Sequence, residues 1–300
     1  MDIIKEITRA NYNIGFICSE TDEELVYGES NDNRVEWLDW NGYKGGWFAD
    51  PFILSVNDSS IEVLVEEWNN KLEKGRISKL VIDKASNKLQ KVIPLLENDT
   101  HFSFPYIWSE NGKVFVCPEN YQSGGFFIYE YDKEKEKLVN PFCLINEPLL
   151  DAQLMKYKGE YYVFAVRQDN GSKQCKLLYV YKSPNLMGDY KQIQTIENPL
   201  KEERGAGTII SINNHLIRPA QSCEVDYGYS MVFYELAEDN GLFAEKEIGR
   251  MYPNKKLRWN RKIHTYNRFG NMVVVDGYEY NHRHISNIYR TTIKKFYSVL

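Results

Sequence analysis

The sequence repeats one pattern about every fifty residues: a polar or proline-containing opening, an apolar strand, a tight turn, and a second apolar strand that ends in a polar residue. The pattern occurs at residues 50–67, 104–119, 151–167, 206–221 and 262–276. A period of this length supplies one multi-stranded sheet per copy. Because such sheets arranged around an axis build a propeller, the sequence predicts an all-β, five-bladed β-propeller.

Turn residues mark the hairpin between the first two strands of every copy, because Gly, Asn and Asp tolerate positive φ. These turns are Asn57–Ser60, Asn111–Gly112, Lys158–Gly159, Asn213–Asn214 and Phe269–Gly270. Alternating segments after the hairpins predict outer strands at 77–82, 89–93, 126–131, 138–144, 177–181, 231–236 and 285–290. Residues 13–18, before the first copy, are expected to pair with the last blade and close the ring.

Bulk composition excludes several classes of protein. The net charge is −5 and the Lys and Arg residues are dispersed, which argues against a nucleic-acid partner. The chain shows neither an apolar leader nor an apolar run long enough to span a bilayer. We therefore expect a soluble, cytoplasmic protein with a single domain over residues 1–300.

Cysteines and aromatic residues give weaker signals. The odd number of cysteines, without any CxxC pair, indicates small core residues rather than disulfides or a zinc site; they are Cys18, Cys117, Cys143, Cys175 and Cys223. The 22 Tyr, 14 Phe and 6 Trp suit half-buried strands. Most of these rings must be structural, although a sugar-binding protein would also place some near its site.

Polar residues open the first strand of each copy. In a propeller these strands face the central channel, so their openings converge at one end of it; they carry Asp50, His101 with Ser103, Asp151, Arg204 and His264. Each residue alone could cap a turn, and an Arg facing two Asp could simply neutralise them. Together, at matching positions, they favour a shared polar site.

Two of these openings resemble glycosidase motifs. The segment from Trp47 to Ile53 resembles the first-blade signature of five-bladed glycosidases of families 43, 32 and 68, in which an Asp before Pro is a catalytic carboxylate. Leu150-Asp151-Ala152 looks like the third-blade segment of family 43, whose Asp orients the acid and tunes its pKa. The resemblance implies these roles for Asp50 and Asp151.

A second resemblance covers essentially the whole chain. The sequence is similar to domains related to the N-terminal part of glucosamine inositolphosphorylceramide transferase. The matching motifs are Phe48–Phe52, Gly75-Arg76-Ile77, His101–Pro105, Pro118-Glu119, Arg204–Gly207, Ile217–Gln221, Tyr227-Gly228 and His264-Thr265.

The fourth blade departs from family 43, whose hydrolysis needs a carboxylic acid there to protonate the leaving oxygen. This chain has Arg204-Gly205-Ala206-Gly207 at that place, and a one-residue shift turns the neighbouring Glu203 to the other face. Arg204 and Arg218, with Arg167 and His264 at the same mouth, indicate instead a phosphate leaving group, which needs positive charge rather than a proton. Asp50 would then be the base.

The second strands end in Glu67, Glu119 and Asp276, which either join the site or cap hairpins; Glu119 is the best candidate. The predicted catalytic residues are Asp50, Asp151 and Glu119. The predicted substrate-binding residues are His101, Ser103, Arg167, Arg204, Arg218, Gln221 and His264. No cofactor or metal is expected, because His282 and His284 alternate on a strand without an acidic or thiol partner at a ligand spacing.

The leading hypothesis is glycosyl transfer from an activated nucleotide sugar to a polysaccharide or glycolipid acceptor. A glycoside hydrolase similar to family 43 and a non-catalytic glycan-binding propeller are the alternatives.

Overall fold

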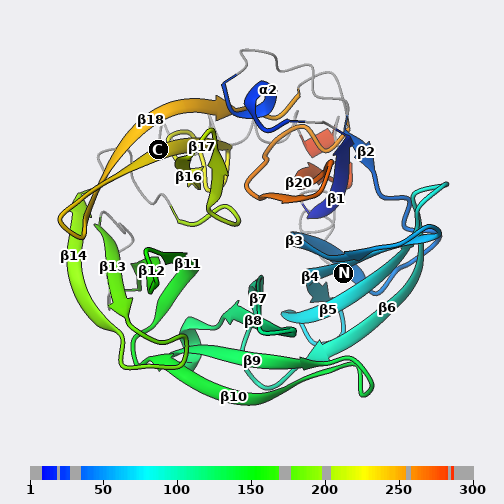
Figure 1. Ribbon diagram of the computed structural model, residues 1–300. Coiled ribbons are helices and arrows are strands. Elements are labelled where there is room, and N and C mark those ends of the chain that lie inside the picture. Colours follow the sequence, from blue (N-terminus) through cyan, green and yellow to red (C-terminus); the bar gives the residue numbers. More distant parts are fainter. Residues whose placement is uncertain are drawn as a thin grey trace, which may run out of the picture.

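A computed structural model describes residues 9–18, 21–27, 35–168, 177–197, 204–254, 258–282 and 285–286. These residues form five antiparallel sheets of four strands each, arranged in a ring (Figure 1). The prediction of a five-bladed β-propeller is confirmed. No helix in these ranges is long and apolar enough to cross a bilayer.

Four blades follow one another along the chain, and each runs from its innermost to its outermost strand. Blade 1 contains β3 (Gly46–Val56), β4 (Ser60–Asn69), β5 (Lys74–Asp83) and β6 (Lys88–Leu96). Blade 2 contains β7 (Ser103–Glu110), β8 (Lys113–Glu119), β9 (Phe126–Asp132) and β10 (Lys137–Ile145). Blade 3 contains β11 (Leu149–Tyr157), β12 (Glu160–Arg167), β13 (Leu177–Ser183) and β14 (Lys191–Glu197). Blade 4 contains β15 (Ile210–Ile212), β16 (His215–Ser222), β17 (Ser230–Asp239) and β18 (Leu242–Met251).

Blade 5 closes the ring with strands from both parts of the chain. It contains β19 (Tyr266–Phe269), β20 (Met272–Tyr280), β1 (Ala10–Cys18) and β2 (Glu36–Trp37). The expected closing strand is confirmed, since β1 pairs with β20 from Ala10 opposite Tyr280 to Cys18 opposite Met272. The strand predicted over 285–290 is wrong where it can be tested, because Ile285 and Ser286 are helical and β1 occupies that place in the sheet; 287–290 lie outside the described residues.

Most hairpin turns adopt the predicted positive φ. Both turn residues do so at Asn111–Gly112, Lys158–Gly159 and Asn213–Asn214, whereas at Phe269–Gly270 only the glycine does. The turn Asn57–Ser60 closes differently: the Asn57 side-chain oxygen accepts the backbone N–H of Ser59 at 2.9 Å and that of Ser60 at 2.7 Å. Asn can therefore shape a turn through its side chain as well as its backbone.

The hydrophobic core lies between the blades rather than in the channel. The buried apolar side chains of the described residues form five main clusters, each shared by neighbouring blades. Of the cysteines, only Cys117 is buried; Cys18 and Cys143 are exposed and Cys223 is intermediate, which corrects the prediction that all are core residues. Cys175 lies outside the described residues.

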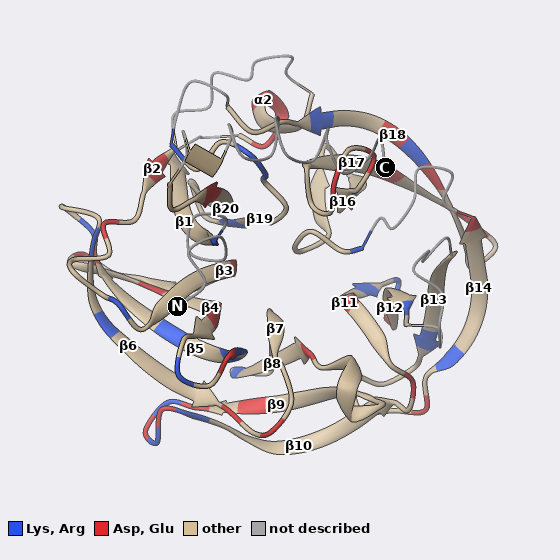
Figure 2. Cartoon of the chain, turned by 180° about the vertical axis from the view of Figure 1, so that it is seen from behind, with Lys and Arg blue, Asp and Glu red and all other residues tan. Residues whose placement is uncertain are grey.

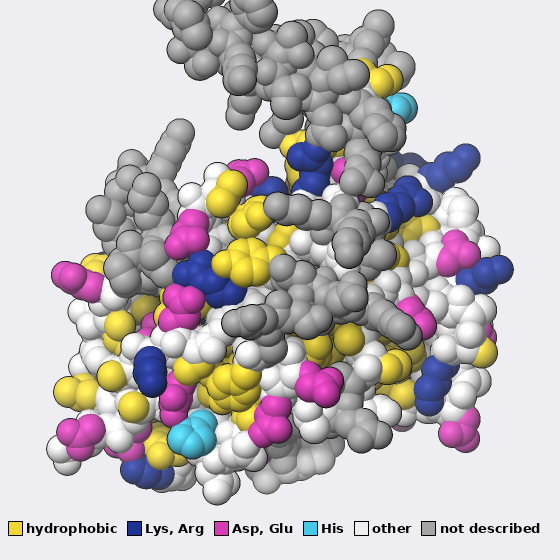
Figure 3. Space-filling model, turned by 90° about the horizontal axis from the view of Figure 1, so that it is seen from above, with side chains coloured by type: hydrophobic (Ala, Val, Ile, Leu, Met, Phe, Trp, Pro, Cys, Tyr) yellow, Lys and Arg dark blue, Asp and Glu magenta, His cyan; other side chains and the backbone are white. Residues whose placement is uncertain are grey.

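Charged residues of both signs are interspersed along the chain around the ring (Figure 2). A perpendicular view shows the same mixture, with apolar side chains between the charges (Figure 3). The short helix α2 (Glu23–Val26) packs beside β18, and the 3-10 turn η1 (Tyr121–Ser123) follows β8. Neither interrupts the five-fold arrangement of the sheets.

A buried arginine joins blades 3 and 4. Arg218 on β16 is fully buried and pairs with Glu245 on β18 at 2.5 Å. Its guanidinium also donates to the Gln153 side chain of β11 at 3.2 Å. The predicted substrate-binding role therefore does not match its position, since Arg218 serves as a link inside the wall of the ring.

We expect Arg218→Ala to lower the free energy of unfolding by about 3–5 kcal/mol, because it leaves the Glu245 carboxylate buried without its charge partner. Urea denaturation measures this loss. Arg250→Ala on β18 is the matched control: Arg250 pairs with the more exposed Glu247 and Glu224, so its removal should cost about 1 kcal/mol or less. Equal effects of the two substitutions would contradict the structural role of Arg218.

Candidate active site

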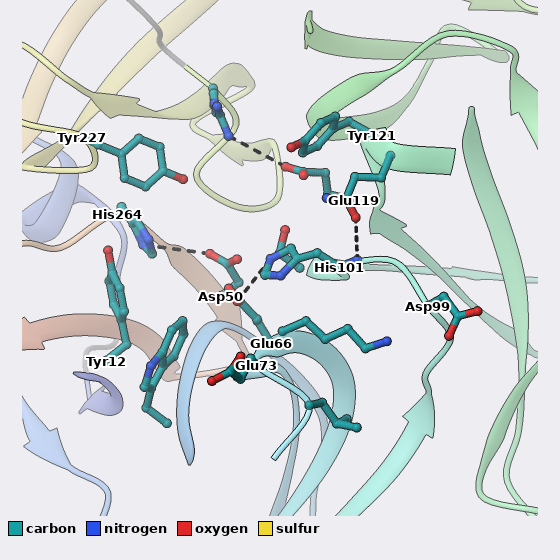
Figure 4. A pocket seen from close by; sticks show the side chains of 16 residues that line it. Tyr12, Asp50, Glu66, Glu73, Asp99, His101, Glu119, Tyr121, Tyr227 and His264 are labelled. Carbon is teal, nitrogen blue, oxygen red and sulfur yellow. Dashed lines mark hydrogen bonds and ion pairs between the residues drawn. The ribbon is translucent and has the colours of Figure 1, made fainter. Parts of the chain in front are cut away.

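A cavity of about 740 Å³ opens at the end of the channel where the innermost strands begin. Its wall contains carboxyl groups, cations and aromatic rings from blades 1, 2, 4 and 5 (Figure 4). The principal lining residues are Tyr12, Trp47, Asp50, Glu66, His101, Ser103, Glu119, Arg204, Tyr227 and His264.

A bulge recurs at the same place in the innermost strands of blades 1, 2 and 3. The pairing register shifts there, and the first bulged residue has a left-handed backbone: φ is 48° at Asp50, 43° at Phe104 and 43° at Asp151. This conformation is costly for residues other than glycine, and bulges re-aim side chains. The same type of β-bulge thus sets the side-chain direction of both Asp50 and Asp151.

Asp50 is buried and held by hydrogen bonds from two neighbouring blades. One carboxylate oxygen accepts the backbone N–H of Phe104 at 3.1 Å, and the other accepts the Thr265 hydroxyl at 3.0 Å. The ring Nδ1 of His264 lies 3.9 Å from that second oxygen. The carboxyl group therefore has a fixed orientation in the cavity.

Asp276 on β20 lies beneath Asp50 and pairs with His264 at 2.6 Å. It also accepts the backbone N–H groups of His264, Thr265 and Asp50 at 3.0, 3.1 and 3.2 Å. Burial opposes its ionisation, but the His264 charge and these bonds outweigh burial and lower the pKa of Asp276. Burial likewise opposes charging of His264, yet Asp276 raises the pKa of that ring to about 9.

Burial raises the pKa of Asp50 to about 7. The His264 charge and the Thr265 hydrogen bond act in the opposite direction, while the charges of Asp151 and Asp276 add to the effect of burial. A carboxyl group with a pKa near neutrality can both accept and release a proton at physiological pH.

Arg204 lies beside a second pair of carboxyl groups. Its Nη1 atom is 3.9 Å from both Glu119 and Asp151. Burial raises the pKa of each acid; Arg204 opposes this, and a hydrogen bond between the acids favours a proton on Asp151. Gln221 completes the cluster by donating to Asp151 at 2.9 Å.

Two glycines allow Arg204 to reach this position. A Cβ atom on Gly205 would lie 2.2 Å from the Asp151 carbonyl oxygen, and one on Gly207 would lie 1.9 Å from that of Tyr266. Gly207 also has a φ of 138°, which side chains disfavour. The segment therefore packs tightly between blades 3 and 5 and presents Arg204 at the cavity.

Glu66 and His101 form a third polar pair in the cavity. The His101 Nδ1 atom accepts the Gly75 backbone N–H at 2.9 Å, so its proton is on Nε2, which lies 3.4 Å from Glu66. Burial lowers the pKa of His101, and it raises the pKa of Glu66 with help from the charges of Asp50 and Glu119. Burial thus disfavours the charged form of His101, and its Nε2–H points toward Glu66 as a hydrogen-bond donor.

Aromatic rings form one wall. Tyr12 stacks on His264 with ring centroids 5.0 Å apart, and Trp47 lies 5.2 Å from Tyr12. Tyr227 meets His264 edge-on, and the Arg204 guanidinium lies over its ring at 5.3 Å. Such rings offer stacking surfaces to the C–H faces of a sugar.

The structure brings together most of the predicted site residues. Asp50, Glu119, His101, Ser103, Arg204 and His264 line the cavity, and Asp151 and Gln221 lie buried directly behind Arg204. Arg167 does not join them: it pairs with Glu147 at 2.9 Å and lies over the Tyr179 ring in blade 3. Arg218, as described above, is inside the ring wall.

Sequence reasoning missed Glu66 by one residue. The prediction fell on the next residue, Glu67, and consecutive strand residues face opposite sides of the sheet. The Glu67 carboxylate therefore faces away from the cavity, where it pairs with Arg76 at 2.9 Å and accepts the Ser78 hydroxyl at 2.6 Å. Sequence reasoning also missed Tyr12 and Trp47, whose signal was weak because the aromatic residues of a propeller are mostly structural. Glu203, the other acid considered, lies outside the described residues.

Asp50, His264 and Asp276 each offer a ligand atom within 4.8 Å of the others, a spacing that could hold a metal ion. The ion pair of Asp276 with His264 and its hydrogen bonds from three backbone N–H groups hold these residues together, so their proximity is explained by an ion-pair network. His282, considered as a ligand from the sequence, lies away from this cavity, and His284 lies outside the described residues.

An NMR titration of the histidine rings should distinguish the two cavity histidines. His264 should titrate at about pH 9, because Asp276 stabilises its charged form, whereas His101 should titrate below the usual histidine value. Asp276→Asn should move the His264 transition to lower pH and leave that of His101 in place. A His264 ring that is neutral at pH 7 would contradict the ion pair.

Comparison with known proteins gives relatives in plants. Residues 37–264 match the family described as "Glucosamine inositolphosphorylceramide transferase 1, N-terminal". The protein of that name from Oryza sativa subsp. japonica is 22% identical over 227 residues, which cover 70% of this chain and 30% of that protein. Its counterpart from Arabidopsis thaliana is 23% identical over 196 residues, covering 63% and 25%. The chain thus spans less than a third of these relatives.

Solved structures of family 43 proteins share the fold. The exo-β-1,3-galactanase from Phanerochaete chrysosporium, solved with galactose, superposes with a TM-score of 0.55 at 10% identity over 71% of this chain and 53% of that chain. A putative exo-β-1,3-galactanase from Bifidobacterium bifidum gives 0.53 at 14% identity over 71% and 78%. These values establish similarity of fold to the five-bladed glycosidases, and the match over residues 37–264 establishes that the chain belongs to the glucosamine inositolphosphorylceramide transferase 1 N-terminal family.

Proposed function

We propose that this propeller transfers a glycosyl group from a nucleotide sugar to a hydroxyl of a glycan or glycolipid acceptor. The observation that carries the proposal is the placement of Arg204 in one cavity with Asp50. Such transfer needs a base and a cation: Asp50 has a pKa near 7, and Arg204 lies beside two acids whose pKa values burial raises. The names of the plant relatives support the class of reaction.

Asp50 would act on the acceptor. Its carboxylate accepts the proton of the acceptor hydroxyl while the oxygen forms a bond to the anomeric carbon of the donor sugar. A general base of this kind contributes about 10²–10⁴-fold to a rate. His264 and Thr265 hold the carboxylate in place, and Asp276 keeps His264 charged so that its field favours the ionised base.

Arg204 would act on the leaving group. As the anomeric carbon–oxygen bond breaks, its electron pair passes to the nucleoside diphosphate, whose negative charge a guanidinium stabilises without donating a proton. Because the pKa values of Glu119 and Asp151 are raised, these acids neutralise Arg204 less than two ordinary carboxylates would. Tyr12, Trp47 and Tyr227 provide stacking surfaces for the sugar.

Hydrolysis of a glycoside is the second candidate, and the Glu119–Asp151 pair favours it specifically. A carboxyl group with a raised pKa is the usual general acid of glycosidases. In that case the proton on this pair would protonate the departing oxygen, and Asp50 would activate water. The general acid would then come from Glu119 of blade 2, alone or sharing its proton with Asp151 of blade 3, instead of from the fourth blade as in family 43.

Substitutions in the cavity should separate binding from turnover. Arg204→Ala should weaken nucleotide-sugar binding at least about tenfold, since a charged hydrogen bond to phosphate contributes about 1.5–3 kcal/mol. Asp50→Asn should leave that affinity within about threefold and lower transfer at least about 100-fold. Calorimetry measures binding, and Arg250→Ala on the outer strand is the matched control. Unchanged nucleotide-sugar affinity in Arg204→Ala would refute the role of this residue.

The pH profile should separate transfer from hydrolysis. If Asp50 is the base, the transfer rate rises as pH increases through about 7 and then levels, because the ionised form is the active one. A hydrolase that relies on the Glu119–Asp151 proton should instead lose activity as that proton leaves at alkaline pH. Release of nitrophenol from aryl glycosides provides the direct assay. Rapid release, together with no affinity for nucleotide sugars, would establish the second candidate.

A further inference from the structure

A second cavity of about 760 Å³ lies at the junction of blades 5 and 1. It is as large as the candidate active site but has separate walls, built from the start of β1, the end of β20 and the segment that leads from β2 to β3. In the ring, β20, β1 and β2 are neighbours in one sheet, and β3 begins the next blade (Figure 1). We propose that this cavity is a binding site for a neutral saccharide, independent of the chemistry in the first cavity.

Alternation along β1 separates the two cavities. Asn11 and Asn13 line the second cavity, whereas Tyr12 between them lines the first. The chain at the start of β3 also contributes to both cavities, since Tyr43, before the strand, lines the second and Trp47, within it, lines the first. Neighbouring residues of the same chain segments therefore line two separate cavities.

The half-buried Trp40 gives the second cavity its stacking surface, and the buried Trp259 packs against it. The rings of Trp40 and Trp259 lie 5.6 Å apart and are tilted by 37°. Asn13, which is only 2% exposed, accepts the Trp40 indole N–H and donates to the Leu38 carbonyl at 3.0 Å, so the ring is fixed. Trp259 has a φ of 58°, a strained backbone for an aromatic residue. A site that binds C–H faces of sugars needs rings held in this manner.

Polar atoms in the wall are suited to hydroxyl groups. Asn11 donates to Asn281, which leaves the amide oxygen of Asn11 and the amide nitrogen of Asn281 without a partner among the described residues. The indole nitrogen of Trp37 is buried and also lacks a partner within those residues. The two amide atoms offer an acceptor and a donor, which a sugar hydroxyl can use in both directions; the buried Trp37 nitrogen is not available to a ligand in this structure.

The charges indicate an uncharged ligand. The wall contains two acids, Asp39 and Glu279, and two permanent cations, Lys44 and Arg258. Glu279 already pairs with Arg261 at 3.3 Å, and the Arg258 guanidinium lies over Trp259 at 5.1 Å. Acids and permanent cations are thus mixed in the wall, with Arg261 beside Glu279 as a further cation, and they form no cluster of one sign for a phosphate, a nucleotide or a carboxylated sugar.

Indole N–H signals in an NMR spectrum test the proposal at the site itself. Neutral trisaccharides of glucose, galactose and mannose are titrated into the intact chain, and signals are assigned by single Trp→Phe substitutions. At least one trisaccharide should move the signals of Trp37, Trp40 and Trp259 and leave that of Trp108, which lines neither cavity. The same shifts should occur in Asp50→Asn, so failure of the proposed transfer activity would not affect this result.

Substitutions complete the test. Trp40→Ala should weaken saccharide binding about tenfold through loss of stacking, whereas Trp108→Ala, the matched control, should not. If Trp40→Ala fails to fold, Asn281→Ala at an exposed position should still weaken binding several-fold. The proposal is overturned if no neutral trisaccharide moves these signals, if shifts are confined to Trp47 in the first cavity, or if only anionic sugars bind.

Discussion

One buried carboxylate, that of Asp276, organises the candidate active site. It ties the backbone of His264 and Thr265 to that of Asp50 across the boundary between blades 5 and 1. A buried anion is stable only when its hydrogen bonds and charge partner are complete, so Asp276 also keeps His264 protonated. That charge limits how far burial raises the pKa of Asp50. Because Asp276 lies on β20, which pairs with the closing strand β1, ring closure and the protonation state of the site depend on the same element.

Repetition supplies the backbone of the site, and differences between blades supply its chemistry. The innermost strands of blades 1, 2 and 3 share one bulge with a left-handed residue, yet Asp50 and Asp151 face the polar centre while Phe104 packs edge-on against Phe52 in the core. Blade 4 replaces the regular strand with a tightly packed glycine-containing segment and presents a cation instead. A polar centre of mixed charge therefore arises where bulged inner strands and the connections that carry Arg204 and Tyr227 meet at one end of the five-fold scaffold.

Much of this arrangement was predictable from sequence. The period, the turn residues and the polar openings placed the blades and grouped Asp50, His101, Arg204 and His264, because a propeller forces equivalent positions to converge. The wrong site predictions concerned residues whose position depends on side-chain orientation or on a distant partner. Glu66 and Glu67 are adjacent on one strand, so their side chains face opposite sides, and Arg218 is held in the wall by Glu245, which is distant in sequence. Tyr12 was inaccessible to repeat analysis, since β1 lies outside the five copies and reaches the cavity only through ring closure.

The formal charges of the site residues give a misleading picture of its potential. Counted at their ordinary pKa values, Asp50, Glu66, Glu119 and Asp151 would make the cavity strongly negative and repel a phosphate. Burial raises the pKa of all four, so they hold protons over a wider pH range than exposed acids do. By contrast, the pairing of His264 with Asp276 favours the charged form of both, and Arg204 is permanently charged. The positive charge of Arg204 is therefore opposed less than the number of acids in the cavity implies, which favours an anionic leaving group there.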